Sequence, residues 1–371
     1  MTAPQPSFVP MAHAGMPPLD ESAEKLSFFE FWPRWLFYAP VIPWWIWFSL
    51  RYGGITLPLI ANPGMPNGGF VGESKSASHG SFGPFARAAL APMVSVPGGN
   101  PDDRLACARS ALKAAGLDYP LVAKPDIGCR GAGVRRINDE AALARYLEYF
   151  PPEADLILQE LIAAPGEAGV YYCRMPGEAE GRVLSLTLKY FPELVGDGQR
   201  TLAELIAADP RAGKLAHIYR ARHRDRLDER IPAGETVRLS FSGSHSKGVI
   251  FRDGRVHITK ALSRAIDRIA RDIDGFYIGR FDIRFTDFPA FLEGRDLRIV
   301  ELNGAGGEMT HIWDSRTRLF DAWRDLYRQF RLLFEIGRAN RRRGVRPPKP
   351  LAFWRAWRTE EALVPTYPPT E

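Results

Sequence analysis

The chain has 371 residues, of which 45% are hydrophobic and 25% charged, and its formal net charge is +6. This composition predicts a globular protein with room for two or three lobes, and it excludes a largely disordered chain. Its three cysteines lack the spacing of metal ligands, which favours a reducing compartment over a disulfide scaffold.

Residues 1–24 are predicted to be disordered, because proline, alanine and methionine occur there without periodicity. The next segment, 25–54, is rich in tryptophan: five of the nine tryptophans lie between Trp32 and Trp47. We treat it as a hydrophobic segment distinct from the lobes that follow.

The middle of this segment, residues 36–50, carries no charge and is flanked by Arg34 and Arg51. It is shorter than the roughly 20 apolar residues of a membrane-spanning helix, and Pro40 and Pro43 interrupt it. Tryptophan with flanking arginine favours the bilayer interface, so we expect a monotopic or re-entrant anchor. Two alternatives stay open: packing over the protein or at a homodimer interface, and a transmembrane helix.

Residues 55–118 are expected to form a shortened N-terminal domain. They include a polar, glycine-rich turn at 67–76 that contains Glu73 and Ser74. An ordinary surface turn is the alternative interpretation.

A short buried strand is predicted at 119–125, ending in Lys124 and a proline. A glycine-rich loop, 126–134, follows it. Glycines let backbone N–H groups approach phosphate oxygens, and lysine adds a positive charge, so this pattern is typical of a phosphate site. The loop glycines concerned are Gly128, Gly131 and Gly133.

Two further strands are predicted downstream. The first covers 156–162, with Glu167 seven residues after Glu160, and the second covers 184–189 and ends in Lys189. Thr201 is then placed to cap a helix.

The most informative segments are 277–285 and 297–310. Both alternate apolar and polar residues, which predicts strands that pair antiparallel. The pairing brings Asp282 together with Glu301 and Asn303. Two carboxylates and an amide oxygen suit Mg²⁺ that carries a nucleotide phosphate.

An amphipathic helix is predicted at 315–340. The region 315–358 has thirteen Lys and Arg against three Asp and Glu, together with aromatic residues near its end. Basic residues with interfacial aromatics suit an anionic membrane surface, whereas no recognition motif supports nucleic acid. A solvated helix end is the alternative.

The order of these motifs resembles that of the ATP-grasp ligases. Arg280-Phe-Asp282 and Glu301-Leu-Asn303, followed by Gly306 and Gly307, are similar to motifs of the D-alanine–D-alanine ligases. Residues 192–206, 231–235 and 240–248 resemble cyanophycin synthetase. The resemblance covers about half of the chain, 120–314, and implies two α+β lobes that clasp ATP. We expect the ATP-grasp domain at 119–320 and the helix with its basic tail at 321–371.

The resemblance also implies roles for individual residues. Phosphates would be held by the two lysines and the three loop glycines, adenine by Glu160, Leu161 and Ile162, and the ribose by Glu167. Magnesium, as two ions with manganese as an alternative, would bind Asp282, Glu301 and Asn303. The oxyanion would be stabilised by Arg280, Gly306 and Gly307. Substrates would contact Glu73, Ser74, Thr310 and His311, the last as a hydrogen-bonding wall or as a general base.

The implied activity is an ADP-forming ligase that joins a carboxylate to an amine through an acyl phosphate. The substrate would be an amino acid, a peptide or a cell-envelope precursor. The alternatives are an ATP-grasp kinase and a non-catalytic, membrane-associated ATP-binding protein. We expect a cytoplasmic protein that lies peripherally on the inner face of the membrane.

Overall fold

The structure, a computed structural model, describes residues 15–20, 26–128 and 131–370. Most of the stretch predicted to be disordered, 1–24, and two residues of the glycine-rich loop, Cys129 and Arg130, lie outside the described residues. The architecture is α+β, as the sequence predicted, and the described residues form three antiparallel sheets of four, five and two strands.

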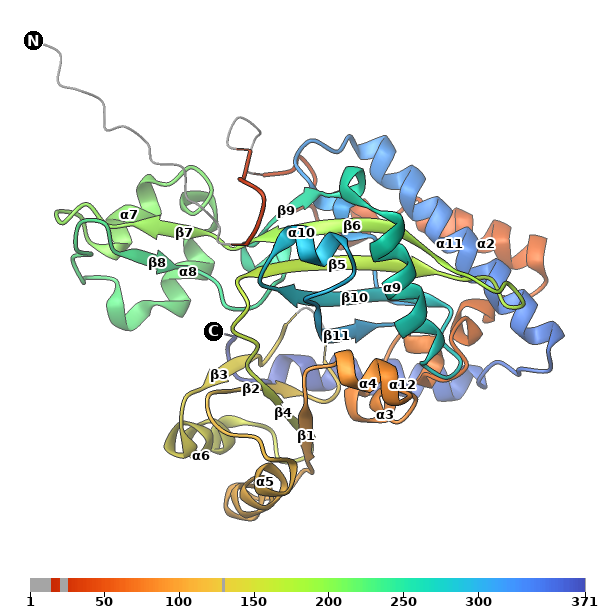
Figure 1. Ribbon diagram of the computed structural model, residues 1–371, viewed down its shortest axis with the longest axis horizontal. Helices are drawn as coiled ribbons and strands as arrows, with labels where there is room; N and C mark the ends of the chain where they lie inside the picture. Colours follow the sequence, from red (N-terminus) through yellow and green to blue (C-terminus); the bar gives the residue numbers. More distant parts are fainter. Residues whose placement is uncertain (1–14, 21–25, 129–130, 371) are drawn as a thin grey trace, which may run out of the picture.

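The smaller lobe is a four-stranded antiparallel sheet with the order β1-β4-β2-β3. Two helices, α5 and α6, cover one face of it (Figure 1). Asn100 and Asp139 cap these helices by accepting hydrogen bonds from backbone N–H groups. The bounds are β1 (Met93–Val96), α5 (Pro101–Ala115), β2 (Leu121–Pro125), β3 (Arg135–Ile137), α6 (Glu140–Tyr149) and β4 (Leu156–Glu160).

The larger lobe contains a five-stranded antiparallel sheet with the order β11-β10-β5-β6-β9. Its strands are β5 (Gly166–Cys173), β6 (Arg182–Tyr190), β9 (Ile250–Asp253), β10 (Ile278–Phe285) and β11 (Arg298–Asn303). One face carries α4 (Pro84–Ala89), α9 (Lys260–Arg271) and α10 (Phe288–Leu292), and the long α11 (Leu319–Arg342) lies on the other. Helix α9 turns Leu262, Ile266 and Ile269 into the core, which is the spacing of an amphipathic helix.

A small unit projects from the larger lobe, at the left of Figure 1. Its hydrophobic core is separate, and Thr201 and Glu204 form a capping box at the start of α7, where the sequence predicted a cap. The unit comprises β7 (Glu193–Val195), α7 (Leu202–Ala208), η3 (Gly213–Leu215), α8 (Ala216–Arg222), η4 (Arg224–Arg226) and β8 (Thr236–Arg238). Short turns η5 (His245–Lys247) and η6 (Arg255–His257) flank β9.

The tryptophan-rich segment forms α1 (Arg34–Phe37) and α2 (Val41–Tyr52), and α2 lies along α11. Phe48 is buried there and packs against Tyr327 and Phe334. The segment is therefore partly packed on the protein. None of the helices in the described residues is long and apolar enough to cross a bilayer.

The lobes do not follow the domain boundaries expected from the sequence. Strand β1 pairs with β4, so the boundary expected between 118 and 119 runs through the smaller lobe. Residues 55–92 contribute helices, turns and isolated bridges to the lobes. Their elements are η1 (Leu57–Ile60), η2 (Pro66–Gly69) and α3 (Lys75–His79), with α4.

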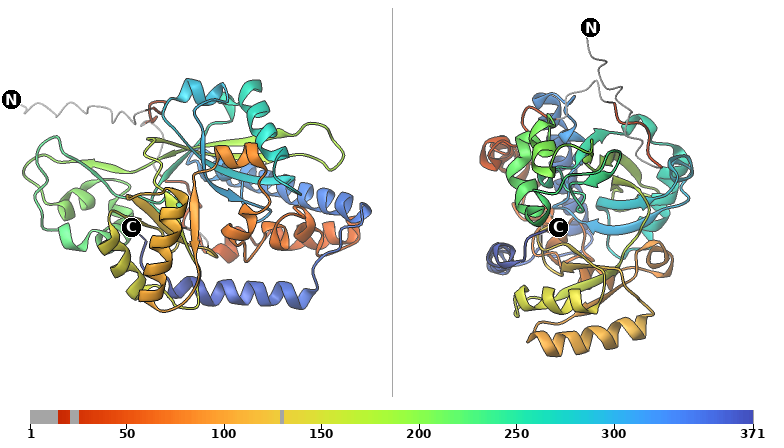
Figure 2. Two further views of the ribbon diagram at one scale, coloured as in Figure 1. Left: turned by 60° about the horizontal axis from the view of Figure 1, so that its bottom comes forward. Right: turned by 90° about the vertical axis from the view of Figure 1, so that its left-hand side faces the viewer.

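The C-terminal end returns to the smaller lobe. Helix α12 (Pro350–Leu363) and η8 (Val364–Thr366) lead to Tyr367, whose ring stacks on Phe150 in the core of that lobe. The last described residues thus connect the far end of α11 with the four-stranded sheet (Figure 2).

Candidate active site

A cavity of about 350 Å³ lies where the two lobes meet. Strands of both sheets line it, and so do the turns at 69–75, the loop at 241–245 and one residue of α12, Glu360. Most of the residues predicted to bind ATP and metal lie on its walls.

Strands β10 and β11 pair in the predicted manner and place the acidic residues in the cavity. Asp282 is directly opposite Glu301, and Arg280 is opposite Asn303. Residues opposite one another in an antiparallel pair share a face of the sheet, so all four side chains gather on one side.

Asp282 is buried and already has partners. Arg280 donates to both of its oxygens, at 2.9 and 3.1 Å, and the Asn303 amide donates to Oδ2 at 3.3 Å. Burial alone would raise the pKa of Asp282, but Arg280 and Lys189 offset this, and the pKa falls to about 2. The carboxylate is therefore ionised at neutral pH.

Lys189 joins two carboxylates. Its Nζ lies 2.9 Å from Glu167 Oε1 and 3.0 Å from Asp282 Oδ1, and Arg284 binds the other oxygen of Glu167 at 2.9 Å. Burial opposes the charge on Lys189, yet the two carboxylates raise its pKa above the usual value. Burial would likewise raise the pKa of Glu167, but Lys189 and Arg284 lower it. Glu167 is thus a buried strand residue that lines the cavity, with each oxygen bound to a cation.

Lys124 comes from the opposite lobe. Its Nζ donates to Gln159 Oε1 at 2.7 Å and to Val300 O at 3.0 Å. Burial lowers the pKa of Lys124 to about 8, although Glu301 acts in the other direction. Lys124 therefore has neutral oxygen partners, whereas Lys189 has two carboxylates.

The glycine-rich loop lies at the mouth of the cavity, where Gly128 and Gly131 line it. Gly131 and Gly133 have φ angles of +71° and +68°, which other residues rarely adopt. The C-terminal tail holds this loop: Tyr367 Oη donates to Ile127 O at 2.6 Å and Thr370 Oγ1 to Gly131 O at 2.7 Å.

The remaining predicted ATP residues lie at the end of β4 and directly after it. Glu160, Leu161 and Ile162 all line the cavity there. Glu160 is the last residue of β4, and the other two begin the connection between the lobes, since β4 belongs to the smaller sheet and β5 to the larger.

The predicted oxyanion donors are not equivalent. Arg280, Gly306 and Gly307 all line the cavity. However, the Gly306 N–H donates to Gly69 O at 2.8 Å and the Gly307 N–H to Gly304 O at 3.0 Å. In this conformation the two amides are engaged within the protein, and Arg280 donates to Asp282 and to Glu308 O.

The predicted substrate residues separate into two groups. Glu73 and Thr310 line the cavity, whereas Ser74 and His311 are outside its lining. Burial raises the pKa of Glu73 to about 8, although it accepts a hydrogen bond from the Gly304 N–H at 3.2 Å. Ser74 caps α3 instead.

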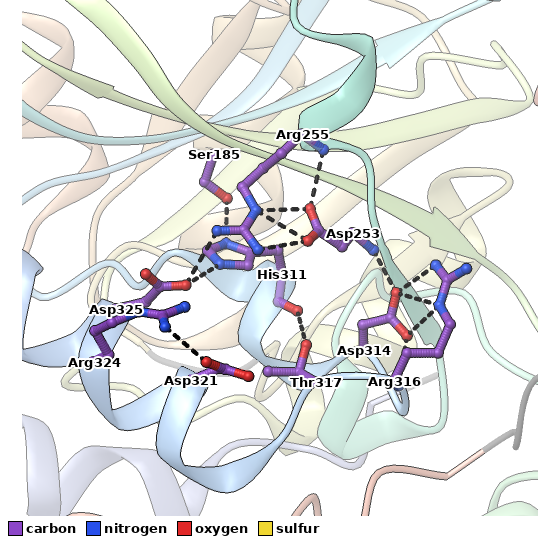
Figure 3. A network of polar contacts seen from close by, with 10 residues as sticks. All are labelled: Ser185, Asp253, Arg255, His311, Asp314, Arg316, Thr317, Asp321, Arg324 and Asp325. Carbon is purple, nitrogen blue, oxygen red and sulfur yellow. Dashed lines mark hydrogen bonds and ion pairs between the residues drawn. The ribbon is translucent and has the colours of Figure 1, made fainter.

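His311 is fully buried behind the cavity wall. Its ring nitrogens lie 2.7 Å from Ser185 Oγ and 2.8 Å from Asp325 Oδ2, and Arg255 also binds Asp325 (Figure 3). This network joins β6, the turn η7 (Thr310–Trp313) and α11. It holds the turn that carries Thr310, and it makes His311 a supporting residue in this conformation.

Several cavity residues had no assigned role in the sequence analysis. Gln159 binds Lys124, and Lys75 donates to Asp126 O at 3.2 Å. Glu308 is contacted by Tyr38 of the tryptophan-rich segment. Glu360 accepts from the Gly72 N–H at 2.6 Å. A polar residue directly after three apolar residues of a buried strand could have indicated Gln159, but nothing local indicates Glu360.

The chemistry of the donors fits a magnesium site. Asp282, Glu301 and Asn303 supply hard oxygen atoms on one sheet face, and Asp282 is ionised. Within the described residues, no group of three or more His, Cys, Asp or Glu side chains is placed to hold a metal alone. The amide oxygen of Asn303, or a phosphate oxygen, would therefore have to complete the site.

No family model matches the chain, and no curated protein matches it. Solved structures of ligases are similar in fold. A bifunctional glutathione synthetase from Pasteurella multocida is 15% identical with a TM-score of 0.34, and the match covers 71% of this chain and 38% of the synthetase. This chain thus spans less than half of the length of that enzyme.

For two further solved structures, the match covers a larger share of the solved chain. A D-alanine–D-alanine ligase from Bacillus anthracis is 13% identical with a TM-score of 0.40, over 76% of this chain and 72% of the ligase. The VanG D-Ala:D-Ser ligase from Enterococcus faecalis is 15% identical with a TM-score of 0.38, over 74% and 64%. At these values the likeness concerns the general fold alone.

Proposed function

We propose that the protein is an ATP-dependent ligase that joins a carboxylate to an amine. One observation carries this proposal: lysines from opposite lobes, Lys124 and Lys189, line the same cavity as the opposed pair Asp282 and Glu301. Two cations beside two carboxylates suit a nucleoside triphosphate with its metal ion, because the cations can bind phosphate and the carboxylates can bind the metal.

ATP would lie between the lobes, with adenine beside Glu160, Leu161 and Ile162. Its phosphates would lie between the two lysines, under the loop that contains Gly128 and Gly131. When bound to Asp282, Glu301 and Asn303, magnesium or manganese would neutralise phosphate charge.

In the first step an oxygen of the substrate carboxylate attacks the γ-phosphorus, ADP leaves and an acyl phosphate forms. In the second step the amine attacks the acyl carbon, a proton is lost and phosphate leaves. Arg280 would stabilise the oxyanion that develops on the acyl oxygen. Because Arg280 also binds Asp282, its guanidinium is held in one orientation.

We further propose that the substrates are small amino acids, peptides or cell-envelope precursors, and that the protein lies on the inner face of a membrane. The first proposal rests on a carboxyl and a hydroxyl that line the same cavity, those of Glu73 and Thr310. The second rests on the exposed aromatic residues of 27–52 and α12.

The test is release of ADP and phosphate with magnesium across a panel of amino acids, dipeptides and hydroxy acids, with mass spectrometry of the products. ADP, free phosphate and a product lighter by one water than its substrates would support the ligase. A phosphorylated product without free phosphate would indicate a kinase. ATP binding without turnover by any member of the panel would favour a non-catalytic nucleotide-binding protein.

A further inference from the structure

An apolar stripe runs along the side of α2 that faces away from α11. Ile42, Ile46 and Leu50 are spaced four residues apart, so they share one side of the helix, and they are 66%, 55% and 76% exposed. Trp47 is exposed beside them. The opposite side of α2 packs on α11 through Phe48. Within residues 15–20, 26–128 and 131–370, α2 packs through one apolar side only, and its second apolar side stays exposed.

The stripe continues toward the N-terminal end of the segment. Phe28, Phe31 and Trp35 are exposed, whereas Phe29 and Phe37 in the same stretch are buried. We call the exposed side chains of 28–50 the outer apolar face. They alternate with buried residues, so the segment is ordered against the protein while it presents a second apolar side.

Helix α12 adds to this surface. It exposes Leu351, Trp354 and Trp357, and in the right-hand view of Figure 2 both α12 and the tryptophan-rich segment lie along the left edge of the molecule. Two separate parts of the chain that contain exposed tryptophans thus lie on the same side of the molecule.

The charges around this surface are basic. Arg34 and Arg51 are exposed within the segment, and Arg341, Arg342 and Arg343 end α11. Helix α12 adds Arg355 and Arg358, but it also carries Glu360 and Glu361, and Glu361 pairs with Arg358 at 3.8 Å. Arg341 donates to Tyr52 O at 3.2 Å, which fixes this basic end of α11 beside the end of α2.

Acidic residues are nearly absent from the segment. Among residues 26–58 the sequence has a single one, Glu30, and it is buried in an ion pair with Arg211 at 2.9 Å. The positive charge around the outer apolar face is therefore not neutralised from within the segment.

We propose that the outer apolar face, together with α12, docks on the interface of an anionic bilayer. The apolar side chains would enter the headgroup boundary, tryptophans would lie at headgroup depth, and the arginines would bind lipid phosphates. A second copy of the chain fits less well, because a two-fold contact sets the same basic surface against itself, so that arginines of one copy face arginines of the other.

The test is co-sedimentation of the full chain with vesicles of phosphatidylcholine alone and of phosphatidylcholine with about 30% phosphatidylglycerol. The protein should bind the anionic vesicles and bind the neutral ones far less. The double variant I46E/L50E should bind them about tenfold or more weakly, because carboxylates resist transfer into the interface. The single variant W47S should show a smaller loss in the same direction.

Val256→Glu is the matched control. Val256 is 88% exposed on η6, in another part of the chain, so this variant adds a carboxylate in place of an exposed apolar residue and should bind like the unaltered protein. Equal binding by I46E/L50E and the unaltered protein, or no binding to anionic vesicles, would overturn the proposal.

Light scattering without lipid tests the alternative that a second copy of the chain covers the outer apolar face. A monomer of 41.6 kDa is expected for the unaltered protein and the variants. A dimer that I46E/L50E converts to monomer would overturn the proposal and assign the face to a second copy. Because vesicle binding needs no turnover, the result is independent of the proposed ligase activity.

Discussion

Lys189 Nζ lies 3.0 Å from Asp282 Oδ1, so the lysine proposed to bind phosphate and the carboxylate proposed to bind magnesium are paired with each other. When ATP binds with its metal, the Lys189–Asp282 pair would have to be replaced by two others, Lys189 with a phosphate and Asp282 with the metal ion. The exchange need not expose either charge, since a phosphate and a cation would enter together. Removing one partner alone, however, leaves the other charge buried.

This pairing separates two substitutions that look equivalent in the sequence. Asp282→Ala would remove the partner of Arg280 and Lys189, so we expect it to abolish turnover and also to destabilise the protein by about 3–5 kcal/mol. Glu301→Gln keeps shape and leaves those cations paired. It should lower turnover about 100-fold or more while the free energy of unfolding changes by about 1 kcal/mol or less. ADP release and chemical denaturation measure the two effects. Full activity of Glu301→Gln would contradict the metal assignment.

Affinity for ATP should fall as pH rises through about 8. Burial lowers the pKa of Lys124 to about 8, so the free protein carries this charge below that pH and loses it above. Phosphate binds the charged form, and ATP binding at higher pH must therefore take up a proton. The dissociation constant should rise by up to roughly tenfold per pH unit above this point. Titration calorimetry between pH 7 and 9.5 checks this.

Two variants show which residue causes the pH dependence of ATP affinity. Lys124→Arg stays charged and should flatten it. Glu73, whose pKa burial raises to about 8, gains negative charge in the same range, so Glu73→Gln should keep the dependence if Lys124 causes it. A slope that survives Lys124→Arg and disappears in Glu73→Gln would transfer the effect to Glu73.

Gly337→Ala should destabilise the protein even though alanine favours helices. A Cβ at this position of α11 would lie 2.0 Å from Leu57 O, and a backbone atom of η1 cannot move aside cheaply. We expect a loss of about 1–3 kcal/mol. Thermal unfolding measures it, with Arg342→Ala on the exposed side of the same helix as the control. An unchanged unfolding temperature would show that α11 and η1 can separate without cost.

Tyr367→Phe should weaken ATP binding without unfolding the smaller lobe. The variant keeps the ring that stacks on Phe150 and removes the hydrogen bond to Ile127 O. The loss of about 1 kcal/mol corresponds to roughly a fivefold rise in the KM for ATP. Thr366→Ala, which removes a hydrogen bond within the tail, should leave the KM unchanged. The same KM in both variants would mean that the tail does not position the loop.

Local pattern was sufficient to predict the pairing of β10 with β11. Period-two alternation places Asp282 and Glu301 on the sheet face, and the short connection makes the strands antiparallel neighbours. The cap at Thr201 and the amphipathic α11 were predicted for the same reason, because each depends on residues a few positions apart.

Features that depend on distant parts of the chain could not be predicted in this way. Tyr367 and Ile127 are 240 positions apart, and nothing near either one indicates their contact. The same holds for His311, whose burial depends on Ser185 and Asp325. The Gly306 N–H donates to Gly69 O, which is far away in the sequence. The glycine pair Gly306 and Gly307 suggested free N–H donors and did not indicate this acceptor.

The insertion of Tyr367 into the core of the smaller lobe has a consequence for synthesis. During synthesis the four strands of that sheet are made long before residue 367. The ring of Phe150 therefore lacks its stacking partner until the C-terminal tail has been made. Until the tail is made, Ile127 O and Gly131 O lack the hydrogen bonds that Tyr367 and Thr370 donate to them. The proposed ATP site would therefore be completed late, after the larger lobe and α11 have been synthesised.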